Sequence, residues 1–311
     1  MAKNTNLVAA KAAKNDEFYT RLEDIEQEMR WYAKHFRNKV VYCNCDDAGS
    51  QFWTYFHSNF TALDLKKLIA THYEPSGKPS YLITYEGGRD LELSFGKQQP
   101  LQSNGDFRSE ECISFLHEAD IVVTNPPWSL VRDFLALMEL YNKKYVFIGN
   151  KNAPICKEIF PLVKNNRLWL GYGSPRKFIT SDGLSGKVVN LSRWYTNLDI
   201  PKRHENLFLS EQFCARYTGH EKDYPKYDNY NAIEVSGMAM IPVDYSGVMG
   251  VPITFLDIYN PEQFEILQLC TSHGEKPKNL QNESCYLNGK WKYARILVRN
   301  KKPVGSNQNE P

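Results

Sequence analysis

Hydrophobic residues in the first half of the chain follow two alternating patterns. Continuous apolar or β-branched runs, typical of buried strands, occupy residues 40–45, 67–74, 119–124 and 145–148. Apolar residues at helical spacing occur over about 22–33, 51–60, 110–116 and 131–141. Shorter runs at 81–84 and 91–95 predict an antiparallel excursion, and Thr20 with Glu23 predicts a capping box before the first helix. Strands that alternate with helices in this way predict an α/β fold with a doubly wound, mostly parallel sheet.

The pattern changes after about residue 200. Residues 166–172 and 187–195 predict the last two strands of the sheet, and beyond them Tyr, Pro, Asn and charged residues become more frequent. Gly237, Gly247 and Gly250 punctuate short strands there, which indicates a smaller second region. We therefore expect a flexible arm at 1–14, a larger domain at 15–199, a smaller region at 200–302 and a disordered tail at 303–311.

Composition narrows the class of protein. The 311 residues are 42% hydrophobic, which is enough for one large α/β domain and a smaller one. No apolar run approaches the roughly 18–20 residues that span a bilayer, and residues 1–6 lack the apolar core of a signal peptide, so we expect a cytoplasmic protein. The seven cysteines are expected to be reduced thiols, and no His/Cys cluster has metal-site spacing, so we expect no metal.

Basic residues gather in a few places although the net charge is only +2. The clusters are Arg176-Lys177, Lys202-Arg203-His204 and a stretch that contains Lys290, Lys292, Arg295, Arg299, Lys301 and Lys302. The candidates for contact with a polyanion are Arg176, Lys177, Lys202, Arg203, Arg295 and Arg299. For each cluster a solvated basic face is at least as good an interpretation as a binding face. Together they favour a polyanionic partner weakly.

The loop Asn125-Pro126-Pro127-Trp128 carries the most specific chemistry. The two prolines fix the backbone and remove two N–H donors. The Asn125 amide oxygen and the Pro126 carbonyl are therefore rigid acceptors beside the flat face of Trp128. A planar amine stacked on that ring could donate one hydrogen to each acceptor, which favours an sp³ nitrogen able to attack a methyl group. This arrangement predicts methylation of an exocyclic amine such as N6 of adenine.

Acidic side chains stand at the ends of the other predicted strands, where ligands bind in open α/β sheets. Asp46 or Asp47 could hold the ammonium of S-adenosylmethionine, Glu74 its ribose diol, and Asp106 its adenine amino group, with Phe107 stacking on the ring. Which of the two adjacent aspartates contacts the cofactor stays open.

Several segments, in this order, resemble the motifs of amino-directed DNA methyltransferases. Phe18-Tyr19-Thr20, Asp46–Ser50, Asp106-Phe107 and Asn125–Trp128 look like motifs X, I, III and IV, in the order of the γ class. More narrowly, the chain resembles the EcoRI-type adenine-specific methyltransferase family over residues 15–270, at Asn15–Thr20, Val41–Asp47, Lys67–Thr71 and Gly250–Asp257. One departure is that motif I usually carries Gly-x-Gly, whereas only Gly49 is present here.

The resemblance implies a Rossmann-like fold that uses S-adenosylmethionine, a smaller C-terminal recognition region, and an adenine flipped out of duplex DNA. It implies cofactor contacts from Phe18, Tyr19, Thr20, Asp46, Asp47, Ala48, Ser50, Glu74, Asp106 and Phe107. Asn125, Pro126, Pro127 and Trp128 would be catalytic, and Trp128 and Trp194 would stack on the target base, with Tyr195 as the alternative to Trp194.

Other activities fit the same loop. The amine could belong to cytosine N4, an RNA adenine or a protein glutamine, and a non-catalytic DNA-binding protein on a methyltransferase fold is a further alternative. The implied setting is restriction-modification or phage protection, in which a cognate restriction endonuclease would act separately. We expect double-stranded DNA as the partner and a monomeric protein.

Overall fold

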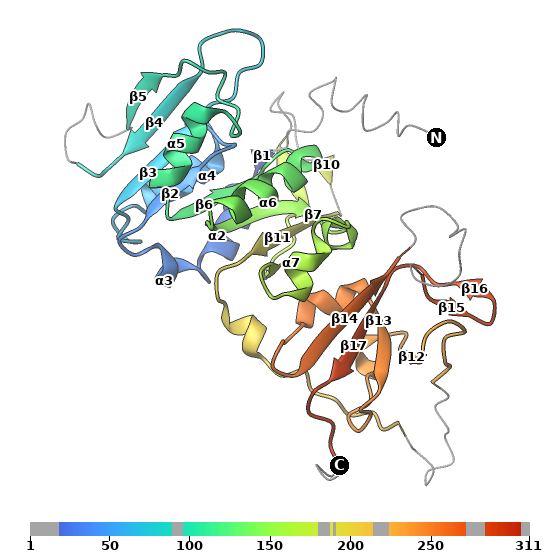
Figure 1. The fold of residues 1–311 in the computed structure, drawn as a ribbon. Coiled ribbons are helices and arrows are strands. Elements are labelled where there is room, and N and C mark those ends of the chain that lie inside the picture. Colours follow the sequence, from blue (N-terminus) through green and yellow to red (C-terminus); the bar gives the residue numbers. More distant parts are fainter. Residues whose placement is uncertain are drawn as a thin grey trace. The chain divides into compact units, whose positions relative to one another are not determined.

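The structure is a computed structural model that describes residues 19–88, 96–179, 187–188, 191–213, 224–271 and 284–305 (Figure 1). All of the predicted arm, most of the predicted tail and the run 91–95 lie outside the described residues. The chain divides into two compact units, one of Met1–Ala153 with Leu168–Leu198 and one of Pro154–Arg167 with Asp199–Pro311. Residues 154–167 thus belong to the second unit although they lie inside the range expected for the larger domain.

The first unit contains an eight-stranded sheet in the order β5-β4-β3-β2-β6-β7-β11-β8. Its strands are β2 (Val40–Cys43), β3 (Lys67–Thr71), β4 (Tyr81–Tyr85), β5 (Lys97–Pro100), β6 (Ile121–Thr124), β7 (Lys144–Asn150), β8 (Trp169–Leu170) and β11 (Ser192–Thr196). Strands β3, β2, β6 and β7 are parallel, and the strands on either side of them pair antiparallel. The chain runs from β2 to β3 on one side and later to β6 on the other, so the strand order reverses between β2 and β6. This confirms the predicted α/β fold and places a ligand-binding crevice at the carboxyl ends of those two strands.

Helices α2 (Leu22–Met29), α3 (Ala33–Phe36), α4 (Gln51–Ser58), α5 (Glu110–Glu118) and α6 (Val131–Leu140) accompany this sheet (Figure 1). A serine caps each of the two helices that follow the predicted site loops. Ser50 accepts a hydrogen bond from the Trp53 N–H (3.1 Å), and Ser109 accepts one from the Cys112 N–H (3.2 Å). The predicted capping box at Thr20 is wrong. Thr20 ends β1 (Tyr19–Thr20), which pairs with β9 (Lys177–Ile179), itself paired with β10 (Lys187–Val188).

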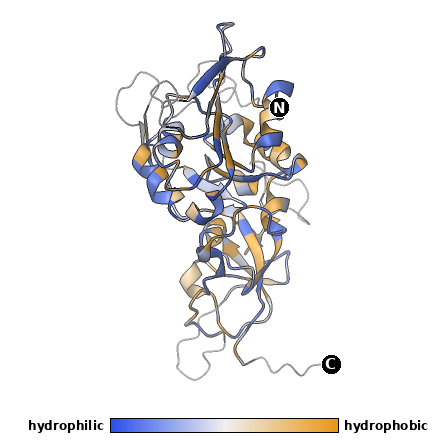
Figure 2. Cartoon of the chain, turned by 90° about the vertical axis from the view of Figure 1, so that its left-hand side faces the viewer, coloured by the Kyte–Doolittle hydropathy of each residue, from blue (hydrophilic) through white to orange (hydrophobic). Residues whose placement is uncertain are grey.

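Aromatic residues fill much of the core of the first unit. Tyr145 and Phe147 on β7 are fully buried and pack against Phe134 of α6 at ring distances of 6.3 and 5.1 Å. Figure 2 shows hydrophobic residues gathered on the strands and on parts of the helices within each unit. Burial of this apolar surface is the main stabilising contribution, and it holds the strand ends at fixed spacing.

The second unit is built on a four-stranded sheet in the order β12-β13-β17-β14. Its strands are β12 (Ala232–Glu234), β13 (Val248–Pro252), β14 (Phe264–Cys270) and β17 (Arg295–Asn300), and the unit also holds α7 (Phe160–Lys164) and the hairpin β15 (Tyr286–Leu287) and β16 (Lys290–Trp291). Short 3₁₀ helices occur at Trp128–Leu130, Ala153–Ile155, Pro201–His204, Met238–Met240 and Ile253–Ile258. Among the helices that the structure describes, none has the length and apolar character needed to cross a membrane.

Candidate active site

The Asn125–Trp128 loop and the loop after β2 are joined by one carboxylate. Asp46 follows β2, and its Oδ2 accepts hydrogen bonds from the Thr124 hydroxyl (2.6 Å) and from the Asn125 backbone N–H (3.1 Å). Thr124 ends β6, so the link crosses the point where the strand order reverses. The Thr124 hydroxyl also accepts a hydrogen bond from the Cys45 N–H (3.2 Å). These contacts fix the backbone of Asn125 relative to the pocket.

Burial raises the pKa of Asp46 to about 7, although its hydrogen bonds from Thr124 and Asn125 oppose the rise. The nearby Asp47 raises it further. A carboxyl in this state gains free energy from a cation, because the cation stabilises its ionised form. Asp46 is therefore suited to hold a ligand ammonium.

Asp47 has different hydrogen-bond partners from those of Asp46. Its Oδ1 accepts a hydrogen bond from the Gly49 N–H (2.8 Å), and its Oδ2 lies 2.9 Å from Nδ1 of His72. The other ring nitrogen, Nε2, lies 3.9 Å from Glu74 Oε2, and the His72 ring stacks on Tyr81 with centroids 4.9 Å apart. His72 thus connects two of the predicted acidic residues. Sequence reasoning missed it, and the available signal was its place at the end of the strand, two residues before Glu74.

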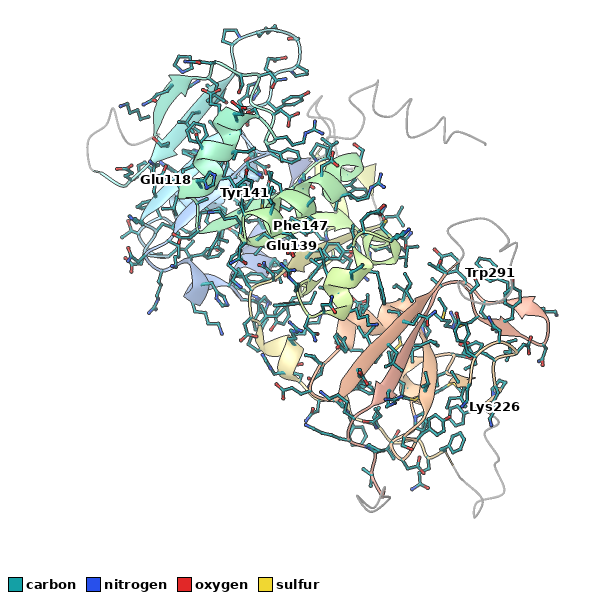
Figure 3. The ribbon with its side chains drawn as sticks, in the orientation of Figure 1. Glu118, Glu139, Tyr141, Phe147, Lys226 and Trp291 are labelled. Atoms are coloured by element: carbon teal, nitrogen blue, oxygen red, sulfur yellow. The ribbon has the colours of Figure 1, made fainter. Side chains whose placement is uncertain are left out.

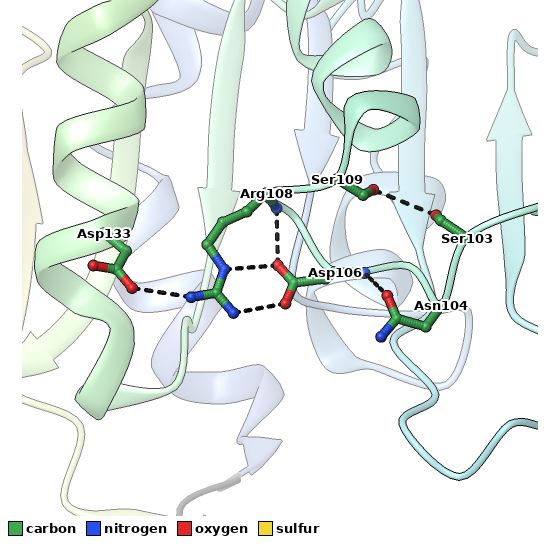
Figure 4. Close-up of polar contacts among 6 residues, drawn as sticks. All are labelled: Ser103, Asn104, Asp106, Arg108, Ser109 and Asp133. Atoms are coloured by element: carbon green, nitrogen blue, oxygen red, sulfur yellow. Dashed lines mark hydrogen bonds and ion pairs between the residues drawn. The ribbon is translucent and has the colours of Figure 1, made fainter.

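Asp106 is held by a guanidinium (Figure 4). Arg108 donates to both carboxylate oxygens, from Nε (2.9 Å) and Nη2 (2.7 Å), and its backbone N–H donates to Oδ1 (2.9 Å). The third guanidinium nitrogen, Nη1, contacts Asp133 on α6 at 3.0 Å. Hydrogen bonding to Arg108 lowers the pKa of Asp106, so its carboxylate remains an ionised acceptor. Asp106 was predicted from its place in the sequence, whereas Arg108 was not.

Gly105, just before Asp106, allows two loops to approach closely. Its φ is +76°, and a Cβ built there would collide with the His72 carbonyl oxygen. Both the backbone conformation and the close approach therefore require glycine. This contact places Asp106 beside the loop that carries His72.

One pocket brings together residues from these loops. Of the predicted site residues, those that line it are Asp46, Asp47, Ser50, Asp106, Phe107, Asn125 and Pro127. Lining residues that were not predicted are Asn44, Cys45, Thr71, His72, Tyr73, Gly105 and Leu130. Ala48 and Glu74 are half-buried neighbours in the same loops, and the Phe107 ring is almost enclosed against Phe134 at 6.2 Å. Carboxylates, an amide and an aromatic ring thus converge on one cavity.

Trp128 lies beside the motif X strand. Its ring meets Phe178 of β9 edge-on at 6.5 Å, and Phe178 pairs in register with Thr20 of β1. Pro126 and Thr20 are buried. Phe18 lies outside the described residues, as does the side chain of Tyr19. Strand β1 and the Asn125–Trp128 loop therefore both adjoin Phe178 of β9.

Trp194 and Tyr195 are enclosed in the core. Their exposed fractions are 1% and 0%. Trp194 packs edge-on against Phe52 at 6.0 Å, and Tyr195 stacks on Phe147 at 5.2 Å. Neither ring has an exposed face on which a target base could stack in this structure.

The predicted basic residues have different surroundings. Arg176 is exposed, and the side chain of Lys177 lies outside the described residues. Lys202 is half-buried, Arg203 donates to Asn166 Oδ1 (2.7 Å), and the half-exposed Arg299 lies 3.6 Å from Glu265. Arg295 differs from these. Its guanidinium is 15% exposed and bonds at 2.8 Å to Glu234, a carboxylate that is 2% exposed, so it contributes to the fold of the second unit.

Within the part of the chain that the structure describes, no group of three or more His, Cys, Asp or Glu side chains could hold a metal ion.

Comparison with known proteins gives matches over nearly the whole chain. The model of the family described as adenine-specific methyltransferase EcoRI matches residues 6–301. The chain is 42% identical to the Type II methyltransferase M.EcoRI of Escherichia coli, over 97% of this chain and 98% of that protein. It is 38% identical to the Type II methyltransferase M.MpnI of Mycoplasma pneumoniae, over 95% and 98%, and 36% identical to M.MgeORF184P of Mycoplasma genitalium, over 93% and 97%. No solved structure matches the chain.

Proposed function

The chain belongs to the EcoRI family of adenine-specific methyltransferases, and on that premise we propose that it methylates N6 of adenine in duplex DNA with S-adenosylmethionine as the methyl donor. The observation that carries the proposal is the pair of hydrogen bonds from Thr124 and Asn125 to Asp46. They join a carboxylate suited to a cationic ligand to the loop that would hold the reacting amine.

The donor set of the pocket fits S-adenosylmethionine. When bound, this cofactor supplies an electrophilic methyl group on a sulfonium. Asp46 would hold the methionine ammonium. Burial destabilises the ionised carboxylate of Asp46, and a bound cation would offset that cost. Asp106, kept ionised by Arg108, would accept from the adenine amino group, and Glu74 would accept from the ribose hydroxyls. Of the two adjacent aspartates we therefore assign the ammonium to Asp46, since Asp47 is engaged by His72.

Asn125 and Pro126 would act on the target base. Its amino group would donate one hydrogen to the Asn125 amide oxygen and one to the Pro126 carbonyl, while Trp128 stacks on the ring. Two acceptors that favour an sp³ nitrogen act more strongly on the transition state than on the ground state. Asn125 and Pro126 would thus orient the amino nitrogen toward the methyl group that the cofactor would supply, and the proton that the nitrogen gives up would go to solvent, so no strong general base would be needed.

The target adenine must leave the helix before it can reach this loop, at a cost of a few kcal/mol. Residues 200–302 would bind the duplex, with phosphate contacts from Lys202, Arg203 and Arg299 and from Arg176 and Lys177 of the first unit. Such contacts set affinity rather than sequence. The setting we propose is restriction-modification or phage protection, with a monomeric enzyme and a separately acting restriction endonuclease.

Transfer of radiolabelled methyl groups tests the substrate class. We expect label from S-adenosylmethionine to enter duplex DNA, and not RNA of the same sequence or a glutamine-rich protein. Label in RNA or protein but not in DNA would contradict the proposal. Binding of the cofactor without transfer to any of the three would favour a non-catalytic protein on this fold.

A further inference from the structure

A small hairpin in the second unit has a rigidly fixed backbone. Strands β15 and β16 are joined by Asn288-Gly289, both with positive φ (52° and 70°), as in a tight two-residue turn. The Asp228 carboxylate accepts hydrogen bonds from the N–H groups of Asn288 (3.1 Å) and Gly289 (2.7 Å). Asn229 Oδ1 accepts one from the Tyr286 N–H (3.0 Å). The turn and the first strand are thus both held by the segment that contains residues 228 and 229.

This hairpin presents aromatic and basic side chains in alternation. Trp291 is 42% exposed and Tyr293 is 55% exposed, and their rings meet edge-on at 6.0 Å. Lys290 is exposed, and Lys292, which lies between the two rings in sequence, is half-buried. Lys226 lies two residues before Asp228, the residue that binds the turn, and adds another exposed positive charge (Figure 3).

Two physical arguments point to a ligand. Large aromatic side chains that stay exposed to solvent on a fixed backbone do not gain the free energy of burial. Exposed apolar surfaces of this kind are typical of interaction sites. In the described segments 226–229 and 286–293, the three lysines Lys226, Lys290 and Lys292 outnumber the single carboxylate, Asp228, so these segments carry a net positive charge. Positive charge complements phosphates, and a two-stranded β-ribbon has the width of the DNA major groove.

We propose that the hairpin 286–291, with Tyr293, is a DNA-contacting element of the second unit. Trp291 and Tyr293 contact bases or sugars in a groove of the duplex, and Lys226 and Lys290 contact phosphates. The inference rests on the proposed function, because that function supplies the duplex as the ligand. It adds Lys226 and the aromatic residues Trp291 and Tyr293 to the basic residues that the sequence had already indicated.

The test compares the full-length wild type with a Trp291→Ala/Tyr293→Ala double variant. A Phe208→Ala variant is the matched control, since Phe208 is a large aromatic residue of the same unit and is 87% exposed. Fluorescence anisotropy measures affinity for a labelled mixed-sequence duplex, and calorimetry measures affinity for S-adenosylmethionine. We expect the double variant to bind DNA about tenfold or more weakly, with unchanged cofactor affinity and melting temperature, and the control to stay within about twofold of wild type.

Lys290→Ala provides a second measurement. It should reduce the slope of log affinity against log salt by about one unit, because the variant neutralises one phosphate fewer. DNA affinity of the double variant equal to that of wild type would overturn the inference, as would an equal loss in the Phe208→Ala control. If the wild type itself neither binds nor methylates DNA, the proposed function fails. If the wild type methylates DNA and the double variant binds DNA as tightly as the wild type, the hairpin assignment fails while the proposed function stands.

Discussion

Protonation of Asp46 should control the affinity for S-adenosylmethionine. Burial raises the pKa of this carboxyl to about 7, so below pH 7 the protein without cofactor holds it mostly protonated. If the ionised form binds the methionine ammonium, the proton must leave before or during binding. Each pH unit below the pKa then costs about 1.4 kcal/mol, or tenfold in affinity.

The dissociation constant should therefore be flat above pH 7 and rise about tenfold at pH 6 and about 100-fold at pH 5. The effect of pH on folding stability has the opposite sign to its effect on cofactor binding. A carboxyl whose pKa is raised by folding favours the folded state when protonated, so its contribution to the stability of the cofactor-free protein falls as pH rises from about 4 to 7. The two trends together distinguish binding from general acid denaturation.

Isothermal titration calorimetry from pH 5 to 8 measures the effect. In Asp46→Asn the pH dependence should disappear, and the affinity at pH 8 should be weaker than that of wild type. Asp64→Asn, which changes an exposed carboxyl between α4 and β3, should keep the wild-type profile. A wild-type affinity that does not change between pH 5 and 8 would refute the assignment of the ammonium to Asp46.

Three further substitutions test separate parts of the account. Asn125→Ala should lower kcat about 100-fold or more with cofactor affinity nearly unchanged, because the acceptor it removes acts mainly in the transition state; near-wild-type turnover in the methyl-transfer assay would exclude the catalytic assignment. Gly105→Ala should weaken cofactor binding about tenfold or more by calorimetry, because its Cβ would collide with a backbone carbonyl. The control Gly77→Ala should leave cofactor binding unchanged, since Gly77 has a similar φ of +80° but open space around it. Arg295→Ala should cost about 3–5 kcal/mol in urea unfolding, because it leaves the buried Glu234 carboxylate without its cationic partner and, among the described residues, with only the Tyr227 hydroxyl as a donor, and Arg299→Ala should cost under about 1 kcal/mol. Equal costs for the two arginine variants would contradict the structural role.

The fold could be predicted because its central strands are buried on both faces. Strands β2, β3, β6 and β7 therefore appear as continuous apolar runs. Strand β5 was missed for the opposite reason. Its residues Lys97–Pro100 are all exposed at the sheet edge, so no apolar pattern marks it. The family resemblance drawn from the motifs is confirmed by the family match over residues 6–301.

The sequence predicted several of the residues that gather at the site, because strand ends determine that, but not the partner that each side chain takes there. Parallel strands bring their carboxyl ends to one edge, which is why Asp46 after β2 and Asn125 after β6 line one pocket. Asp106 follows the antiparallel strand β5 and reaches the same pocket through the close approach of Gly105 to His72. Which partner each side chain takes depends on distances that spacing does not encode. The same limit applies to Arg295, because nothing in the run of basic residues indicates that its partner is the buried Glu234 on another strand.

The most direct measurement maps the modified bases. The protein is incubated with isotopically labelled S-adenosylmethionine and a long duplex of mixed sequence, and the products are analysed by nucleoside mass spectrometry and by sequencing that detects modified bases. We expect N6-methyladenine as the labelled nucleoside, at one short recurring sequence, and none with Asn125→Ala. Label on cytosine, or DNA that carries no label under conditions in which the cofactor binds, would contradict this expectation.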